Sequence, residues 1–311
     1  MILTVCPNTA LDKILFIDEW IPGTPMRTKQ VVNCVGGKGL NSAVALSHLG
    51  VETVGLGFFA GKIGQELVEL VEEYGIVVDA VWVDGVNRIA HVIADAKNRQ
   101  HSHVIAGEVI VSENQKKTFV ERFSHHLKKA KFIILAGSLP PSLNDDFYVT
   151  LIQMAQKAGV RVLIDSQKVY MRQVIKTKPD IVKMNWEEFE WTFDKKAANL
   201  QSLKDQAADF KKKNDLPNLI LTLSKEGILA LTREGDYLVR APYQEPVNAA
   251  GAGDAVSAAL AWRLSEGDKW ETALKWASAV SAAAVLTERT GDLRMDDVNR
   301  LLPEIQFIDI K

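Results

Sequence analysis

The chain has 311 residues, of which 47% are hydrophobic and 24% are charged, and its formal net charge is −2. This is an ordinary globular composition with ample material for a core. The net charge excludes an overall basic field that would attract nucleic acid or an anionic membrane, and it leaves locally basic pockets open. The length predicts about two domains, or one large α/β domain with an attachment. We therefore expect no nucleic-acid partner and no membrane partner.

Short β-branched apolar runs alternate along the chain with longer amphipathic stretches. The predicted strands cover residues 2–5, 53–56, 132–136, 161–164, 181–184 and 219–223. The predicted helices cover residues 39–49, 64–74, 147–158, 200–213, 254–265, 270–286 and 295–302. Such alternation indicates βαβ units and a mostly parallel sheet covered by helices on both faces.

Two β-rich polar segments, at about residues 11–34 and 77–106, interrupt this alternation. We interpret residues 1–311 as one α/β domain in which these two inserted segments form a small β-sheet lid. A lid of this kind excludes water during group transfer. The alternative is an extra hairpin packed on the edge of the main sheet.

The cysteines and the N-terminus bear on the compartment. Cys6 and Cys34 are the two cysteines of the chain, and neither belongs to a CxxC or Cys/His cluster. The first 17 residues lack the basic start and continuous apolar run of a signal peptide. The sequence therefore predicts a reducing, cytoplasmic location.

The segment Asn248-Ala-Ala-Gly-Ala-Gly-Asp254 directly precedes a predicted helix and carries the strongest local signal. Glycines at a helix start leave backbone N–H groups uncovered, and the helix dipole adds positive potential, which suits a phosphate group. Asp254 falls in the first turn, where a carboxylate is favourable. The alternative is a tight turn with Asp254 as its N-cap.

A second glycine-rich segment, Gly36-Gly-Lys-Gly-Leu-Asn41, also precedes a predicted helix. Its glycines permit close approach of the backbone to a ligand, and Asn41 could hydrogen-bond a hydroxyl-rich substrate; a loop with a solvated lysine is the alternative. It is not a P-loop, because no glycine stands five residues before the one preceding Lys38. Residues 55–60 match GxGxxA, but further glycines interrupt any immediate helix, so the dinucleotide signal is weak.

Three further motifs end predicted strands, at the edge where parallel sheets bind ligands. They are Ala-Gly-Ser-Leu-Pro-Pro at 136–141, Lys-Met-Asn-Trp-Glu-Glu at 183–188 and Thr-Leu-Ser-Lys-Glu-Gly at 222–227. In the second, Asn185 and Glu188 are three apart and would face the same way on a helical turn, as needed to steer Mg²⁺ toward a triphosphate. The alternative for that motif is a helix N-terminus stabilised by acidic residues.

Taken in order, these motifs resemble the phosphofructokinase B, or ribokinase-like, carbohydrate kinase family. The shared series is Asn8-x-x-x-Asp12, Gly-Gly-Lys-Gly-x-Asn, Gly-Ser-Leu-Pro-Pro, Asn-x-x-Glu and Gly-Ala-Gly-Asp. The match extends from about residue 2 to residue 302, and the ordered set is far more specific than any single motif. The first and third motifs look most like the 1-phosphofructokinase and tagatose-6-phosphate kinase branch.

The resemblance implies a ribokinase-like α/β/α core with a β-sheet lid that often dimerises, so a homodimer is expected, with ATP as co-substrate and Mg²⁺. It implies Asp254 as the catalytic base. The backbone around the transferring phosphoryl group would come from Gly251, Ala252 and Gly253. Sugar hydroxyls would contact Asp12, Gly37 and Asn41.

The remaining implied roles concern the charged groups of the two substrates. The sugar's own phosphate would contact Arg27, Arg88, Ser138 and Lys38. ATP would contact Lys183, Asn185, Thr222, Ser224 and Gly227. Mg²⁺ would be held through water by Asn185 and Glu188.

Several positions depart from the family pattern. On the substrate side, Thr9 stands in place of Pro and Ala90 in place of Asn, which bears on the sugar that is used. On the nucleotide side, Ala249, Met184 and Ser224 stand in place of Thr, Pro and Gly, which bears on ATP affinity.

The leading interpretation is an ATP-dependent kinase of a hexose phosphate, namely fructose 1-phosphate, tagatose 6-phosphate or fructose 6-phosphate. A kinase of an unphosphorylated sugar or nucleoside is the main alternative. It is favoured by Ala90 and by Pro25, near which some family members have a lysine for the sugar phosphate, and it is opposed by Arg27, Arg88 and the Gly-Ser-Leu-Pro-Pro motif. A non-catalytic regulator that binds sugar or nucleotide is a remote alternative, because a pure binder needs no base such as Asp254.

Overall fold

A computed structural model of the chain describes residues 1–98 and 100–309. Within these residues the largest element is a ten-stranded sheet, the main sheet, with the order β16-β15-β14-β13-β12-β11-β10-β1-β4-β5. Its strands are β1 (Ile2–Cys6), β4 (Thr53–Phe59), β5 (Val77–Trp82), β10 (Phe132–Ala136), β11 (Arg161–Asp165), β12 (Ile181–Asn185), β13 (Leu219–Thr222), β14 (Ile228–Leu231), β15 (Asp236–Arg240) and β16 (Gln306–Ile308).

In the main sheet, the neighbouring strands β5, β4, β1, β10, β11, β12 and β13 run parallel, and β14, β15 and β16 continue the sheet antiparallel. In the centre, Leu3 of β1 lies opposite both Ile133 of β10 and Val54 of β4. These central strands are apolar and buried along most of their length because helices cover both faces. The carboxyl ends of the parallel strands therefore meet at one edge of the sheet.

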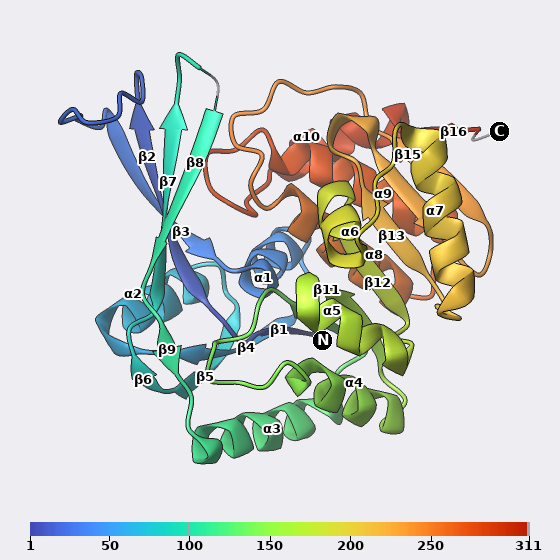
Figure 1. The fold of residues 1–311 in the computed structure, drawn as a ribbon, viewed down its shortest axis with the longest axis horizontal. Coiled ribbons are helices and arrows are strands. Elements are labelled where there is room, and N and C mark those ends of the chain that lie inside the picture. The colour runs from blue at the N-terminus through green and yellow to red at the C-terminus, as the bar shows by residue number, and fades with distance from the viewer. Residues whose placement is uncertain (99, 310–311) are drawn as a thin grey trace.

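Helices form a layer on each face of the main sheet (Figure 1). They are α1 (Lys38–His48), α2 (Gly61–Glu72), α3 (Glu113–Leu127), α4 (Phe147–Lys157), α5 (Lys168–Val174), α6 (Trp186–Phe193), α7 (Leu200–Lys213), α8 (Ala252–Ser265), α9 (Trp270–Ala284) and α10 (Met295–Leu301), with 3₁₀ turns η1 (Ile175–Thr177), η2 (Ser224–Glu226) and η3 (Leu302–Glu304). One core contains side chains of α3 to α7, and the second contains side chains of α1, α8, α9 and α10. The predicted three-layer α/β/α architecture is confirmed.

A separate four-stranded sheet, the small sheet, projects from the main body (Figure 1). Its order is β3-β2-β7-β8, formed by β2 (Ala10–Ile17), β3 (Gln30–Gly36), β7 (Arg88–Asp95) and β8 (Gln100–Ala106). A further pair, β6 (Asp84–Gly85) with β9 (Val109–Ile110), lies at its base. The small sheet shares no strand with the main sheet, so it is not a hairpin added to an edge.

The predicted second insertion at 77–106 is wrong at its start. Residues Val77–Trp82 form β5, which pairs parallel with β4 at the edge of the main sheet. The physical reason is that α2 returns the chain as an ordinary βαβ crossover before the small sheet resumes at Arg88.

The GxGxxA segment has a structural explanation. Gly55 and Gly57 lie inside β4, where no phosphate-binding turn exists. A Cβ atom on Gly57 would lie 2.7 Å from Cγ2 of Thr9 and 2.8 Å from the carbonyl oxygen of Cys6. The glycine therefore allows close packing, and the dinucleotide alternative loses its basis. Over the described residues, every helix is too short or too polar to cross a bilayer.

Candidate active site

A cavity of about 450 Å³ opens at the carboxyl edge of the main sheet. Parallel sheets bind ligands at this edge, and a cavity of this size suits a small molecule. Its lining includes eleven of the residues predicted from the sequence, namely Lys38, Lys183, Asn185, Glu188, Thr222, Ser224, Gly227, Gly251, Ala252, Gly253 and Asp254. The segments that carry them are far apart in the chain and meet only in the folded protein.

The start of α8 forms one wall of this cavity, and its two glycines serve different purposes. Gly251 has φ 83°, and a Cβ atom there would lie 2.4 Å from the backbone nitrogen of Gly291. Gly253 has no such strain, but its Cβ would lie 3.2 Å from Nζ of Lys183. The backbone conformation and the close contact with Gly291 thus require a glycine at position 251. Gly253 instead keeps the first turn of α8 open beside the ammonium group of Lys183.

Asp254 follows in the first turn of α8 and is 6% exposed. Its Oδ2 accepts a hydrogen bond of 2.8 Å from Nδ2 of Asn41. Burial, reinforced by the charge of Asp165, raises the pKa of Asp254 to about 7, although Lys38, Lys183 and Asn41 oppose the rise. A carboxylate with this pKa can gain and release a proton near neutral pH.

Asp165 is a site residue that we did not predict from the sequence. It ends β11, its side chain is 1% exposed, and it accepts hydrogen bonds from Lys38 at 2.7 Å and Lys183 at 2.5 Å, with Ser257 Oγ at 3.3 Å. Burial opposes its ionisation, but the two ammonium groups lower the pKa of Asp165 to about 2. Its one available signal was an acidic residue at the carboxyl end of a predicted strand.

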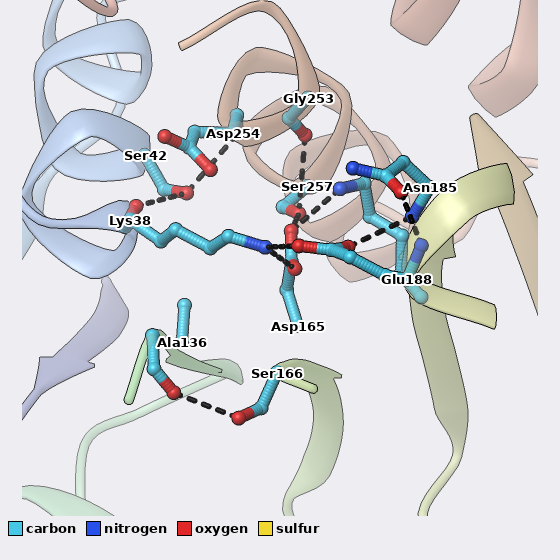
Figure 2. Close-up of polar contacts among 12 residues, drawn as sticks. Lys38, Ser42, Ala136, Asp165, Ser166, Asn185, Glu188, Gly253, Asp254 and Ser257 are labelled. Carbon is cyan, nitrogen blue, oxygen red and sulfur yellow. Dashed lines mark hydrogen bonds and ion pairs between the residues drawn. The ribbon is translucent and has the colours of Figure 1, made fainter. Parts of the chain in front are cut away.

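Asn185 and Glu188 form a capping box at the start of α6. Oδ1 of Asn185 accepts from the backbone N–H of Glu188 at 2.6 Å, and Oε2 of Glu188 accepts from the backbone N–H of Asn185 at 2.9 Å. Oε1 of Glu188 also accepts from Lys38 at 2.8 Å (Figure 2). The acidic helix N-terminus considered above is therefore present, and its carboxylate also borders the cavity.

The far wall of the cavity contains the 222–227 segment. Ser224, which stands where the family pattern has glycine, adopts φ 53°, a conformation that strains a residue with a side chain. Gly227 has φ 100°, and a Cβ there would lie 2.2 Å from the carbonyl oxygen of Val239. The wall is completed by residues of α9 that the sequence did not indicate, namely Ser278, Ser281 and Ala282.

A second group of predicted residues meets at the base of the small sheet. Nη2 of Arg88 donates to the carbonyl oxygen of Asn8 at 2.6 Å, and Nδ2 of Asn8 contacts Oγ of Ser138 at 3.2 Å. Among the described residues, Nε of Arg88 and Oδ1 of Asn41 are buried polar atoms without a hydrogen-bond partner. Unpaired buried groups of this kind are rare, and these two belong to residues predicted to bind the substrate.

Asp12 belongs to the same group. Burial, and next the nearby charge of Asp254, raise the pKa of Asp12 to about 7. Asp12 lies opposite Ala90 in the register of β2 and β7, so the alanine leaves space beside the carboxylate. Gly37, with φ 92°, lies where a Cβ would come within 2.8 Å of Sγ of Cys6.

Two predicted residues lie elsewhere. Arg27 is exposed in the connection between β2 and β3. That connection lies at the outer end of the small sheet (Figure 1). Lys38 faces Asp165 and Glu188 in the cavity, whereas the sequence placed it with Arg88 at the sugar's phosphate. Thr9, a departure from the family pattern, donates to the carbonyl oxygen of Phe58 and accepts from Asn87.

Comparison with known proteins gives one family. A model described as "pfkB family carbohydrate kinase" matches residues 8–296 of the chain. The tagatose-6-phosphate kinase of Staphylococcus epidermidis is 27% identical over 314 residues, covering 100% of both chains. The D-tagatose-1-phosphate kinase of Klebsiella oxytoca is 28% identical over 313 residues with the same coverage.

A solved structure agrees in fold. Phosphofructokinase-2 from Escherichia coli, in complex with substrates and products, superposes with a TM-score of 0.90, covering 97% of this chain and 98% of that one. Its sequence is 22% identical, so this likeness concerns the fold alone.

Proposed function

Because the chain belongs to the pfkB family of carbohydrate kinases, we propose that it transfers the γ-phosphoryl group of ATP to a hydroxyl group of a hexose phosphate. The observation that supports this most is the position of Asp254. It lines the cavity at the carboxyl edge and accepts a hydrogen bond from Asn41, whose Oδ1 is unpaired, and the charges of both Asp254 and Arg88 act on the pKa of Asp12. A base at that place can serve a hydroxyl on one side and a phosphoryl donor on the other.

Asp254 would accept the proton of the attacking hydroxyl. Its raised pKa of about 7 makes it a stronger base than an ordinary carboxylate while leaving much of it ionised near neutral pH. Asn41 holds the carboxylate through Nδ2, and its free Oδ1 can accept from a sugar hydroxyl. We therefore place the reacting sugar between Asn41, Asp254 and Asp12.

The start of α8 would stabilise the transferring group. The backbone N–H groups of Ala252, Gly253 and Asp254 belong to a helical first turn without a side-chain cap, so they can donate to phosphoryl oxygens. Phosphoryl transfer depends mainly on such positioning and charge stabilisation. Lys183 lies beside Gly253, with its charge balanced by the ion pair to Asp165.

The phosphate of the sugar would bind at the base of the small sheet. The guanidinium of Arg88 offers its free Nε, and Ser138 offers a hydroxyl nearby. Guanidinium groups bind phosphate by directed, often bidentate hydrogen bonds. The names of the relatives, which are kinases of tagatose phosphates, agree with a phosphorylated hexose as acceptor.

Mg²⁺ would accompany ATP, and the cavity offers a fitting donor set. Magnesium keeps several waters and needs only one or two carboxylates beside the phosphates; Glu188 presents a carboxylate to the cavity next to the amide oxygen of Asn185. When bound, the ion would neutralise charge on the triphosphate. The residues Asn185 and Glu188 would orient its water shell.

The proposal extends to assembly and location. Val31 of β3 and Val104 of β8 are 48% and 54% exposed, so each edge strand of the small sheet leaves an apolar side chain at the surface. We expect a homodimer through the small sheets, which sedimentation analysis would detect. The free thiols of Cys6 and Cys34 are buried and fit a cytoplasmic enzyme.

The experiment that tests the proposal is an ATP-consumption screen. The acceptors are fructose 1-phosphate, fructose 6-phosphate, tagatose 6-phosphate, free hexoses, ribose and nucleosides. We expect a hexose phosphate to give the highest kcat/KM. A free sugar or nucleoside that exceeds every phosphosugar would establish the alternative kinase, and absence of turnover with all acceptors would remove the catalytic proposal.

A further inference from the structure

Lys38 bridges two carboxylates that differ in their surroundings. Its Nζ lies 2.7 Å from Oδ1 of Asp165 and 2.8 Å from Oε1 of Glu188. The side chain of Asp165 is 1% exposed, whereas that of Glu188 is 12% exposed and lines the cavity. Figure 2 shows the lysine extending from α1 so that its ammonium group lies between them.

Asp165 does not depend on Lys38 alone. Its other carboxylate oxygen accepts from Lys183 at 2.5 Å, and both of those side chains are almost fully buried. Lys38 itself is 29% exposed and lines the cavity. The Asp165–Lys183 pair is therefore almost fully buried, whereas the contact between Lys38 and Glu188 is more exposed at the cavity.

We propose that Lys38 exchanges partners when nucleotide binds: it leaves Glu188 for the phosphate chain of ATP while Asp165 retains its hold on the ammonium group. The argument is one of charge and reach. A phosphate chain carries more negative charge than one carboxylate, and lysine binds phosphate as a compact point charge. The contact with Asp165 keeps the ammonium group at the cavity throughout, so the exchange requires only a small rotation.

This exchange has two consequences for the site. Lys38 binds the phosphates of the nucleotide, instead of the sugar phosphate that the family resemblance suggested. Glu188 is released at the moment when a divalent cation would arrive with ATP, so its carboxylate is protected in the empty site and available in the filled one. The inference rests on the proposed function because it requires the cavity to bind ATP.

A static tether is the competing explanation. Lys38 joins α1 to β11 and α6 through its two ion pairs, and such a link could serve stability alone. The two explanations differ in what they predict for ligand binding. If Lys38 is a static tether, replacing it should lower the affinity for ligands with and without phosphate alike. If Lys38 is an exchanging counter-ion, replacing it should change the affinity only for ligands that carry phosphate or that compete for Glu188.

The first measurement is calorimetric binding of ATP and of adenosine, both in excess EDTA. We expect Lys38→Met to weaken metal-free ATP by roughly 10- to 150-fold, the range for losing a charge-assisted hydrogen bond, and to change adenosine affinity by less than about threefold, because adenosine has no phosphate. Lys62→Met is the matched control, since Lys62 is exposed on α2 outside the cavity lining. It should change neither affinity.

Glu188→Gln supplies a second variant that retains Lys38. Removing the competing carboxylate should strengthen metal-free ATP binding by about threefold or more, because the ammonium group no longer leaves a charged partner. Binding of Mn²⁺ without nucleotide, followed by electron paramagnetic resonance, supplies the reverse test. Lys38→Met should bind Mn²⁺ more tightly than the wild type, and Lys38→Met combined with Glu188→Gln should lose that gain.

Three results would overturn the exchange: equal loss of ATP and adenosine affinity in Lys38→Met, unchanged ATP affinity in that variant, or weaker metal-free ATP binding by Glu188→Gln. Each of these results would support the static tether instead. Failure of the kinase proposal is distinguishable, because it would appear as a wild-type protein that binds no ATP.

Discussion

The two sides of the candidate active site differ in how completely their polar groups are paired before any substrate binds. On the cavity side, Lys38, Lys183, Asp165 and Glu188 are joined by ion pairs of 2.5–2.8 Å. On the acceptor side, described atoms of Asn41 and Arg88 remain buried without partners. Under the proposed function, the cavity side would bind the phosphoryl donor with its own charges already paired, whereas the acceptor side would be completed by the hydroxyl and phosphate groups of a sugar.

Replacing Asp254, which stands between the two sides, should give the largest effect. Asp254→Asn keeps the size of the side chain and its place beside Asn41 but removes its basicity. General base catalysis contributes about 10²–10⁴-fold, so we expect kcat to fall by at least about 100-fold with ATP affinity nearly unchanged. Steady-state kinetics and calorimetry measure the two quantities.

A near wild-type kcat in purified Asp254→Asn would show that another group is the base. The matching pH measurement uses wild-type enzyme. Since the base must be ionised and its pKa is raised to about 7, kcat/KM should decline as the pH falls below about 7.

The glycines of the α8 start offer a sharper test of the donor side. Gly253→Val should reduce kcat by about tenfold or more, because the new side chain obstructs the N–H groups that would stabilise the phosphoryl group and would lie against Lys183. Its melting temperature should change little. Gly251→Ala should show the opposite pattern, since a positive φ costs a residue with a side chain about 1–2 kcal/mol and the Cβ meets Gly291.

Thermal melting and turnover of the two glycine variants provide the check. If Gly253→Val lowers the melting temperature as much as Gly251→Ala while turnover persists, the turn is purely structural and the anion-binding role is wrong.

A smaller effect is expected on stability. Burial raises the pKa of both Asp12 and Asp254 from 3.8 to about 7, so between pH 4 and pH 7 the folded state retains protons that the unfolded chain releases. The contribution of each group to stability is therefore greatest at low pH and is lost as the pH rises through 7. Asp254→Asn removes one of these ionisations.

Asp254→Asn should melt at a higher temperature than the wild type at pH 8, and the difference in melting temperature should shrink at pH 5. Scanning calorimetry at the two pH values measures it. A difference that grows toward pH 5 would contradict burial as the cause of the raised pKa of Asp254.

Local signals predicted the parallel core of the fold and the helices α1, α2, α4, α7, α8, α9 and α10, and they placed the start of α8 to within two residues. These features are encoded in short stretches by periodicity and by glycine. Val77–Trp82 was assigned to the wrong sheet. Its sequence pattern shows that it is a strand, but its pairing with β4 depends on the tertiary fold and cannot be read from that pattern. The antiparallel continuation β14–β16 was missed for the same reason.

Asp165 shows why part of the candidate site could not be predicted from the sequence. Its partners Lys183 and Lys38 are 18 and 127 residues away, so no spacing rule connects them. The glycine-rich motifs could be recognised because each one is a short continuous stretch that directly precedes a helix. A buried ion pair between distant strands and helices becomes visible only when the sheet order is known.

The most direct test of the contrast between the two sides compares one phosphosugar with its free sugar on the wild type and on Arg88→Ala. A hydrogen bond to a charged group contributes about 1.5–3 kcal/mol, which is roughly a 10- to 150-fold loss in kcat/KM. We predict that loss for the phosphosugar, with nearly unchanged kcat/KM for the free sugar and unchanged KM for ATP. Equal losses on both sugars would contradict the account, because Arg88 would then shape the small sheet instead of binding the phosphate that completes the acceptor side.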